Sequence, residues 1–343
     1  MPRWRDVVIA GIAGGLAALG IRELLRVGRP RAWLRLPARE LFVANHSVGP
    51  SGYITVARFP GDADGDVPPT SQLYVNNALA VARDRHGNIY VASDTGNQVR
   101  VYAPGTVGTI PAPRRTLQGA ATKIHRPSGL AVDGQGNLYV AERGGPANAS
   151  AVLTFAPGAD GNVAPIAIIP SRMPPPGDVA AVNTRLDIAS GVALDYDGTI
   201  YVVTCSELQR GGESKLLRFS PGANGDVAPV AEVTMGLSEP QQVTLTLSGS
   251  IYVTNRGGNP SITVHTAEPT ADVPPARTIT SADLADPFGI ALDGADRIFV
   301  AEPGQNSVLV FDATANGNVA PLRKLHGGNT GLTAPSGVAV RVL

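Results

Sequence analysis

A repeated sequence unit constrains the fold of this chain more than any other feature. The unit reads PSGLAVDGQGNLYVAE from Pro127, ASGVALDYDGTIYVVT from Ala189 and PFGIALDGADRIFVAE from Pro287. Apolar residues alternate with period two on either side of an Asp-x-x-Gly-type turn, which indicates paired strands rather than a helix. A repeat of this kind indicates the architecture before any single residue is considered.

The second strand of the unit recurs along the whole chain, and a third strand follows each copy. The second strands begin at Leu41, Ile89, Leu138, Ile200, Ile251 and Ile298. Successive copies are about 47 to 62 residues apart, a spacing typical of four-stranded propeller blades. We expect the fourth strands to open with Val-Ala-Pro or Val-Pro-Pro, because an outermost strand tolerates proline. These openings are at Val163, Val227, Val273 and Val319.

The two ends of the repeat array complement each other. The copy at Leu41 lacks a first strand, whereas the segment from Pro335 to Leu343 is a first strand with nothing after it. Pairing the two would close a ring and remove two exposed strand edges. The sequence therefore predicts an all-β, six-bladed β-propeller of four-stranded antiparallel blades over residues 37–343, whose C-terminal strand completes the N-terminal blade.

The repeat also resembles a known family. The pattern P-x-G-[ILV]-A-[VL]-D-x-x-G-x-[IL]-Y-V-A, with DTGNQVRVY from Asp94, closely resembles the NHL-repeat propellers across residues 39–343. It is more distantly similar to the regucalcin/gluconolactonase-like propellers. The resemblance implies the fold, and it implies a range of functions that includes protein-binding and RNA-binding modules, extracellular sensor domains, an amidating lyase and lactonases. Function therefore has to be argued from the site.

Composition excludes several classes of function. The chain has 28 basic and 28 acidic residues, which argues against a nucleic-acid footprint of clustered positive charge. One cysteine, Cys205, allows neither an internal disulfide nor a CxxC metal site. The sequence contains no GxxxxGK[ST], HExxH or GxSxG motif. We therefore expect no nucleic-acid partner and find no established catalytic motif.

The N-terminus has a composition of its own. Arg3 and Arg5 precede an uncharged run over residues 7–21, which is short for a membrane span but suits the core of a signal peptide. We expect residues 1–36 to hold a short apolar helix, as signal peptide or membrane anchor, and a linker. The protein would then be extracytoplasmic, periplasmic or secreted, or tethered to a membrane through residues 7–21. The alternative is an Ala/Gly-rich helix packed on the domain.

One acidic segment, Asp62-Ala-Asp64-Gly-Asp66, looks like a calcium loop. An EF-hand loop needs a bidentate Glu at its last position, and Leu73 stands there instead. The Asp-Gly dipeptide is also typical of a tight hairpin turn. We therefore interpret the segment as a turn.

The repeat varies most where the second strands end, and variable loops on a rigid scaffold commonly carry function. These ends, the residues after them and the blade connections should share one rim of the ring. A concave rim with converging polar groups is the default binding site of such a fold. The predicted rim residues are Asn45, His46, Asp94, His125, Arg126, Glu142, Arg143, Asn255, Arg256 and Glu302.

The leading hypothesis is a non-catalytic binding or scaffold propeller that recognises a protein, peptide or glycan through this rim. One alternative is a lactonase- or esterase-like hydrolase, with Ca²⁺ or another divalent cation held by Glu142, Glu302, Asn45 and Asn255, whose oxygen atoms suit a hard cation. Another is a structural subunit of an extracellular assembly. Only His46 and His125 are expected at the rim, too few for a three-His zinc centre.

Overall fold

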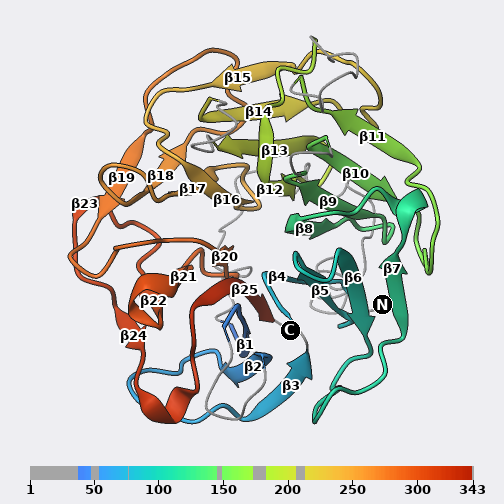
Figure 1. Cartoon of the computed structure of the whole chain (residues 1–343). Coiled ribbons are helices and arrows are strands. Elements are labelled where there is room, and N and C mark those ends of the chain that lie inside the picture. The colour runs from blue at the N-terminus through green and yellow to red at the C-terminus, as the bar shows by residue number, and fades with distance from the viewer. Residues whose placement is uncertain are drawn as a thin grey trace, which may run out of the picture.

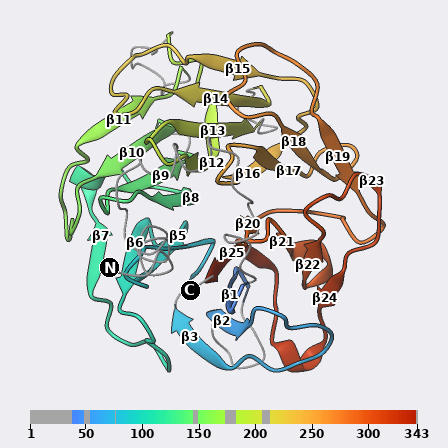
Figure 2. The ribbon, with the colours of Figure 1, turned by 180° about the vertical axis from the view of Figure 1, so that it is seen from behind.

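A ring of six β-sheets forms the whole of the described structure. The computed structural model describes residues 38–47, 54–75, 77–144, 149–172, 183–205 and 213–341. Figures 1 and 2 show the sheets arranged as blades around one axis. The predicted six-bladed propeller is therefore confirmed. The segment expected to be an apolar helix lies outside the described residues, and within them no helix is long and apolar enough to cross a membrane.

Each blade has four antiparallel strands that run outward from the axis in sequence order, except that the chain's last strand is innermost in blade 1. The innermost strands of blades 1 to 6 are β25 (Pro335–Arg341), β4 (Ala80–Arg83), β8 (Pro127–Val132), β12 (Ile188–Leu194), β16 (Pro240–Leu245) and β20 (Ile290–Leu292). The second strands are β1 (Glu40–Asn45), β5 (Ile89–Ser93), β9 (Leu138–Glu142), β13 (Ile200–Cys205), β17 (Ile251–Asn255) and β21 (Ile298–Glu302).

The outer half of each blade completes the sheet. The third strands are β2 (Ile54–Pro60), β6 (Gln98–Tyr102), β10 (Ala151–Phe155), β14 (Lys215–Phe219), β18 (Ser261–His265) and β22 (Ser307–Phe311). The outermost strands are β3 (Ser71–Val75), β7 (Arg115–Gln118), β11 (Ala167–Pro170), β15 (Ala231–Val233), β19 (Arg277–Thr280) and β24 (Arg323–Leu325). Short 3₁₀ turns are η2 (Ala120–Thr122), η3 (Pro303–Gln305) and η4 (Gly328–Thr330), and β23 (Gly317–Asn318) pairs with β19 of the neighbouring blade.

The C-terminal strand closes the ring as predicted. β25 pairs antiparallel with β1, with Val43 opposite Val338 and Glu40 opposite Arg341. The Ser336 hydroxyl also donates to the carbonyl of Leu79 in blade 2, at 2.8 Å. The first and last described strands of the chain thus meet within blade 1, and the inner side of β1 is not an open edge.

Glycine lets the innermost strands approach one another. A Cβ placed on Gly129 would lie 2.9 Å from the Cα of Gly191, and one on Gly289 would lie 2.6 Å from the carbonyl oxygen of Ser336. Real Cβ atoms do not approach backbone so closely, so Gly129 and Gly289 are required by the close approach of their neighbouring strands.

Replacing Gly289 with Ala is therefore expected to destabilise the protein by about 1–3 kcal/mol, because the clash is with backbone that cannot rotate away. Gly134→Ala is the matched control, since a Cβ there would have no heavy atom within 4 Å. Chemical denaturation of both variants measures the difference. Equal midpoints for the two would contradict the close-approach explanation.

The hydrophobic core of the described chain lies between the blades. Between blades 6 and 1, for example, Phe59 and Val43 pack with Phe299 and Val308, all of them fully buried. Comparable clusters fill the other blade interfaces. Alternating residues of the second and third strands supply these side chains, which explains the period-two pattern of the sequence.

In blades 1, 3, 4 and 6, an Asp-Gly or Asn-Gly turn binds the blade to the previous one in the ring. The Asp64 carboxylate accepts the backbone N–H of Lys324 at 3.0 Å, and the Gly65 N–H donates back to the Lys324 carbonyl. The Asp66 carboxylate accepts the N–H of Asn329 at 2.7 Å. The equivalent bonds elsewhere are Asp160 to Thr116, Asn224 to Ile168 and Asn316 to Thr278. The turn interpretation of the calcium-loop lookalike is confirmed, because its carboxylates join blades.

The predicted openings of the fourth strands were wrong by several residues. The segments at Val163, Val227, Val273 and Val319 precede the outermost strands, which begin at Ala167, Ala231, Arg277 and Arg323. Each segment contains proline, which has no N–H to donate to the neighbouring strand. The proline therefore precedes the outermost strand, and hydrogen bonding between strands starts after it.

Candidate functional site

The described part of the predicted rim lies on one face of the ring. All six second strands run in the same direction, so their last residues share that face. We call it the rim face, and call the opposite one, with the turns between first and second strands, the hairpin face. Two side chains at the strand ends, Glu142 and Glu302, are fully buried, and Asn45 and Asn255 are about as buried.

The two glutamates bind backbone N–H groups of their own blades. Glu142 accepts the N–H groups of His125 at 2.9 Å and Arg126 at 2.5 Å. Glu302 accepts those of Ala285 at 3.1 Å and Asp286 at 2.6 Å. In both blades the carboxylate therefore fixes the connection that leads into the innermost strand.

Asn45 and Asn255 occupy the same position in blades 1 and 5 and use an amide oxygen in the same way. Asn45 accepts the N–H of Thr333 at 3.1 Å, and Asn255 accepts that of Ser238 at 3.1 Å. An amide can thus replace the carboxylate wherever only one N–H needs an acceptor.

Burial shifts the titration of both glutamates. It raises the pKa of Glu142 to about 6, although backbone N–H groups oppose the shift. It raises the pKa of Glu302 to about 7, and the nearby charge of Asp286 acts in the same direction. Removal of a carboxylate from water disfavours its charged form, and the backbone donors recover only part of that cost.

The four proposed metal ligands are thus spread over separate blades and bonded within them. Among the described residues, no three or more His, Cys, Asp or Glu side chains are grouped so as to hold a metal ion. Glu142 and Glu302 are already occupied, because each carboxylate accepts two or more backbone N–H groups. The divalent cation stays a prediction without support from this geometry.

His46 and Asp94 form an ion pair between blades 1 and 2, with 3.4 Å between Nε2 and the carboxylate. The neighbouring Asp94 carboxylate raises the pKa of His46. Burial alone would raise the pKa of Asp94, but His46 and the Thr95 N–H hold it below its usual value. Asn77 donates to the same carboxylate at 2.9 Å. Half-buried and polar, the pair is a fixed feature of the rim.

Arg256 and Asp286 make a second pair between neighbouring blades, at 2.8 Å between Nε and Oδ1. Both side chains are partly exposed. Arg126 is exposed, and its guanidinium reaches the carbonyl of Gly144 at 3.5 Å. His125 lies beside Lys123, and burial followed by that charge lowers its pKa. The rim therefore displays charges from blades 1, 2, 3, 5 and 6.

Blade 4 holds its rim together by an ion network around the buried Asp187 and Lys215 instead of a glutamate at the strand end. Asp187 is fully buried, forms an ion pair with Arg172 and accepts the N–H of Glu213 at 2.8 Å. The buried Lys215 lies 3.6 Å from Asp187 and 2.5 Å from Glu213. Breaking one partner of such a network is costly because it leaves an uncompensated buried charge.

A cluster of four side chains crosses the centre of the rim face. Arg143 leaves blade 3 and donates through Nη2 to the Gln241 side chain of blade 5, at 2.7 Å. Its guanidinium lies 5.6 Å from the ring centroid of Phe288 in blade 6. Gln242 donates to the carbonyls of Ser128 at 2.6 Å and Ser190 at 3.1 Å, in blades 3 and 4. We call Arg143, Gln241, Gln242 and Phe288 the channel-mouth cluster.

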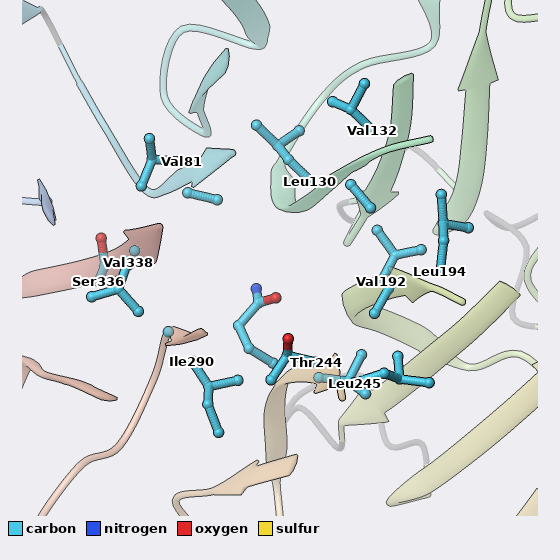
Figure 3. A pocket seen from close by; sticks show the side chains of 17 residues that line it. Val81, Leu130, Val132, Val192, Leu194, Thr244, Leu245, Ile290, Ser336 and Val338 are labelled. Carbon is cyan, nitrogen blue, oxygen red and sulfur yellow. The ribbon is translucent and has the colours of Figure 1, made fainter. Parts of the chain in front are cut away.

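Beneath this cluster lies a cavity of about 240 Å³ along the axis (Figure 3). Val81, Leu130, Val192, Ile290 and Val338 surround it, one from each of five innermost strands, and Figure 3 shows them around a common space. Gln242 also lines it. Its side-chain amide bonds to the Ser128 and Ser190 carbonyls and so links blade 5 to blades 3 and 4 beside the cavity.

Three members of the channel-mouth cluster were not among the predicted site residues. The second and third residues of the P-x-G pattern read Ser-Gly in blades 1, 3 and 4, but Gln241-Gln242 in blade 5. In blade 6 the second residue is Phe288. These exceptions to the pattern are visible in the sequence. Only the ring geometry shows that the side chains of Gln241 and Phe288 contact Arg143.

Comparison with known proteins supports the fold. No protein-family model matches the chain, and no curated protein matches it. A Bacteroides caccae protein of unknown function is similar, with a TM-score of 0.59 and 12% identity over 89% of this chain and 99% of that one. A functionally unknown protein from Desulfotomaculum acetoxidans has a TM-score of 0.54 and 14% identity over 88% and 99%. A structure of a nidogen/laminin complex has a TM-score of 0.59 and 14% identity over 89% and 98%. At these identities the likeness shows a shared propeller fold.

Proposed function

We propose that this chain is a non-catalytic binding propeller of the NHL-repeat type, which recognises a protein, peptide or glycan through its rim face. The observation that carries the proposal is the contrast between the two faces. The hairpin face repeats one turn, in which Asp84, Asp133, Asp195 and Asp293 bond their own loops. The rim face varies more, because its six equivalent strand ends carry four residue types: Asn45, Ser93, Glu142, Thr204, Asn255 and Glu302.

Ion pairs between blades support a recognition surface at the described part of the rim. Its charged groups are held by pairs that join blades, such as His46 with Asp94 and Arg256 with Asp286. Prearranged charges reduce the entropy lost on binding and favour a complementary partner over others. The buried glutamates contribute by fixing the connections beneath this surface.

We further propose that the protein is extracytoplasmic and that residues 7–21 are its signal peptide or membrane tether. Residue 39 lies at the hairpin face, where the Arg39 N–H donates to the Arg341 carbonyl at 2.6 Å. The described part of the chain therefore begins on the face opposite the rim.

Site-specific photo-crosslinking in the native host tests the binding proposal. A benzophenone amino acid at Ser47 or Ser238, both exposed on the rim face, is expected to yield one dominant cross-linked product. The same group at Gln135, exposed on the hairpin face, is the matched control and should not yield it. Mass spectrometry identifies the product. Equal products from both faces, or none from the rim, would contradict a rim site.

A further inference from the structure

The innermost strand of blade 2 ends in an arginine where the other blades have an apolar residue. Arg83 is the last residue of β4 and comes directly before the turn that joins the first and second strands. The equivalent residues of the other five blades pack into the interface with the preceding blade. They are Val132, Leu194, Leu245, Leu292 and Val340. Local exceptions to a consistent pattern are expected at functional sites.

Arg83 reaches across the interface to blade 1, where its guanidinium lies 4.7 Å from the ring centroid of the buried Phe42. Arg323 stacks on Phe299 in a similar way, and it also donates to the carbonyl of Gly61 at 3.0 Å. Among the described residues, Arg83 has no such acceptor, and no carboxylate lies close enough to form an ion pair with it. The fold thus places a cationic group here without using its hydrogen-bond donors.

Two arginines of blade 1 lie at the same end of this interface. Arg58 is opposite Phe42 in the pairing of β2 with β1, and Arg341 is opposite Glu40 in the pairing of β25 with β1. Alternate residues of a strand face the same side, so Glu40 and Phe42 both face blade 2. Nη1 of Arg341 lies 3.0 Å from Oε2 of Glu40, and Nη1 of Arg58 lies 3.4 Å from its Oε1. The Glu40 carboxylate therefore orients two guanidinium groups beside that of Arg83.

The positive charges at this place outnumber the carboxylates of the described residues around them. Burial lowers the pKa of Arg83, and the positive charges of Arg341 and Arg58 act in the same direction. The carboxylates of Glu40 and Asp84 oppose this shift, which leaves three guanidinium groups against two carboxylates. The arginine side chains are also accessible, since Arg58 is 31% exposed and Arg341 is 45% exposed. An anion bound here would offset the cost of burying the excess charge.

Several guanidinium groups at one place suit a phosphate group better than a carboxylate. One guanidinium already matches both oxygens of a carboxylate, whereas a phosphate group presents more oxygen atoms and accepts from several arginines. From this arrangement we propose that Arg58, Arg83 and Arg341 form a phosphate-binding site on the hairpin face. We call it the arginine cluster. It lies opposite the rim and does not depend on the binding function proposed above.

Thermal unfolding of the full chain in phosphate and in chloride at equal ionic strength tests the proposal. Phosphate should raise the midpoint by about 2–3 °C once it exceeds its Kd roughly tenfold. Arg83→Leu gives blade 2 the residue found in blades 4, 5 and 6, so it should fold without loss of stability and should lose the shift. Arg185→Gln, which removes an exposed arginine of blade 4, is the matched control and should keep it.

A soluble phosphate compound and the headgroup of an anionic phospholipid carry the same chemistry, and dihexanoyl phosphatidylglycerol below its micelle concentration separates them. A larger shift than that with phosphate at equal concentration identifies a lipid headgroup, and a smaller one identifies a soluble phosphate compound.

Three results would overturn the proposal: neither phosphate nor the lipid shifts the midpoint more than chloride does, Arg83→Leu keeps the shift, or Arg185→Gln loses it equally. If Arg83→Leu does not fold, Arg58→Gln decides by the same measurement, because Glu40 keeps its pair with Arg341 in that variant. The cross-linking test at Ser47 is independent of all these outcomes, since it probes the opposite face.

Discussion

A chain that stops at Ala334 is expected to lose its cooperative fold. The truncation removes β25, so the inner edge of β1 is left without its partner along the pairs from Glu40 to Asn45. It also removes the Ser336 hydroxyl that bonds the Leu79 carbonyl. Each buried backbone group left without a partner costs about 1–3 kcal/mol. The summed cost of several such groups reaches the 5–15 kcal/mol that is roughly the whole stability of a domain.

Complementation makes this prediction specific to strand pairing. The peptide PSGVAVRVL, added to the truncated chain, should restore a folded ring and a sharp thermal transition. A peptide of the same composition in scrambled order should not, because its residues would no longer match the register with β1 or fill the blade interfaces. Circular dichroism and limited proteolysis follow both. A truncated chain that unfolds at the wild-type midpoint would contradict closure by β25.

The sequence sufficed to predict this closure, for physical reasons. Strand periodicity and the unmatched strands at the two ends fix the number of blades, and the ring follows from the need to pair edges. The proline segments at Val163 and its equivalents misled the strand boundaries, because tolerance of proline at an edge does not show where pairing begins. Boundaries depend on which N–H groups find partners, and those contacts are between strands distant in sequence.

The candidate site could be predicted only in part. Its location at one rim follows from strand direction, but the roles of the residues do not. Glu142 and Glu302 were candidates for the binding rim and for a metal site, and each is buried against backbone N–H groups of its own blade. The contact of Arg143 with Gln241 joins blades that are far apart in sequence. Such cross-ring contacts follow from three-dimensional geometry and are not visible in the repeat.

The buried position of Glu302 leads to the second large effect, a dependence of stability on pH. Burial raises its pKa to about 7 in the folded protein, from an ordinary value of 4.5. The folded state therefore keeps a proton that the unfolded state releases between these values. The stabilisation is complete below pH 4.5 and is lost as the pH rises through 7. We expect wild type to lose on the order of 2 kcal/mol relative to Glu302→Gln between pH 5 and pH 8, after discounting for screening.

The comparison with Glu302→Gln is needed because other groups titrate in the same range. Burial lowers the pKa of His265 to about 4, and that group acts in the opposite direction, losing stability as the pH falls. Urea denaturation of wild type and variant from pH 5 to pH 8 isolates the contribution of Glu302 to the pH dependence of stability. Glu268→Gln, a change at an exposed glutamate, should follow the wild-type profile.

Glu302→Ala separates the charge from the hydrogen bonds. It leaves the N–H groups of Ala285 and Asp286 without their acceptor and should cost about 2–4 kcal/mol at pH 5. Glu302→Gln should cost less there, because an amide oxygen still accepts one N–H, as Asn255 does in blade 5. If Ala and Gln were equally stable at pH 5, the carboxylate would not be holding the connection. A parallel pH profile for wild type and Gln would show that Glu302 is ionised throughout.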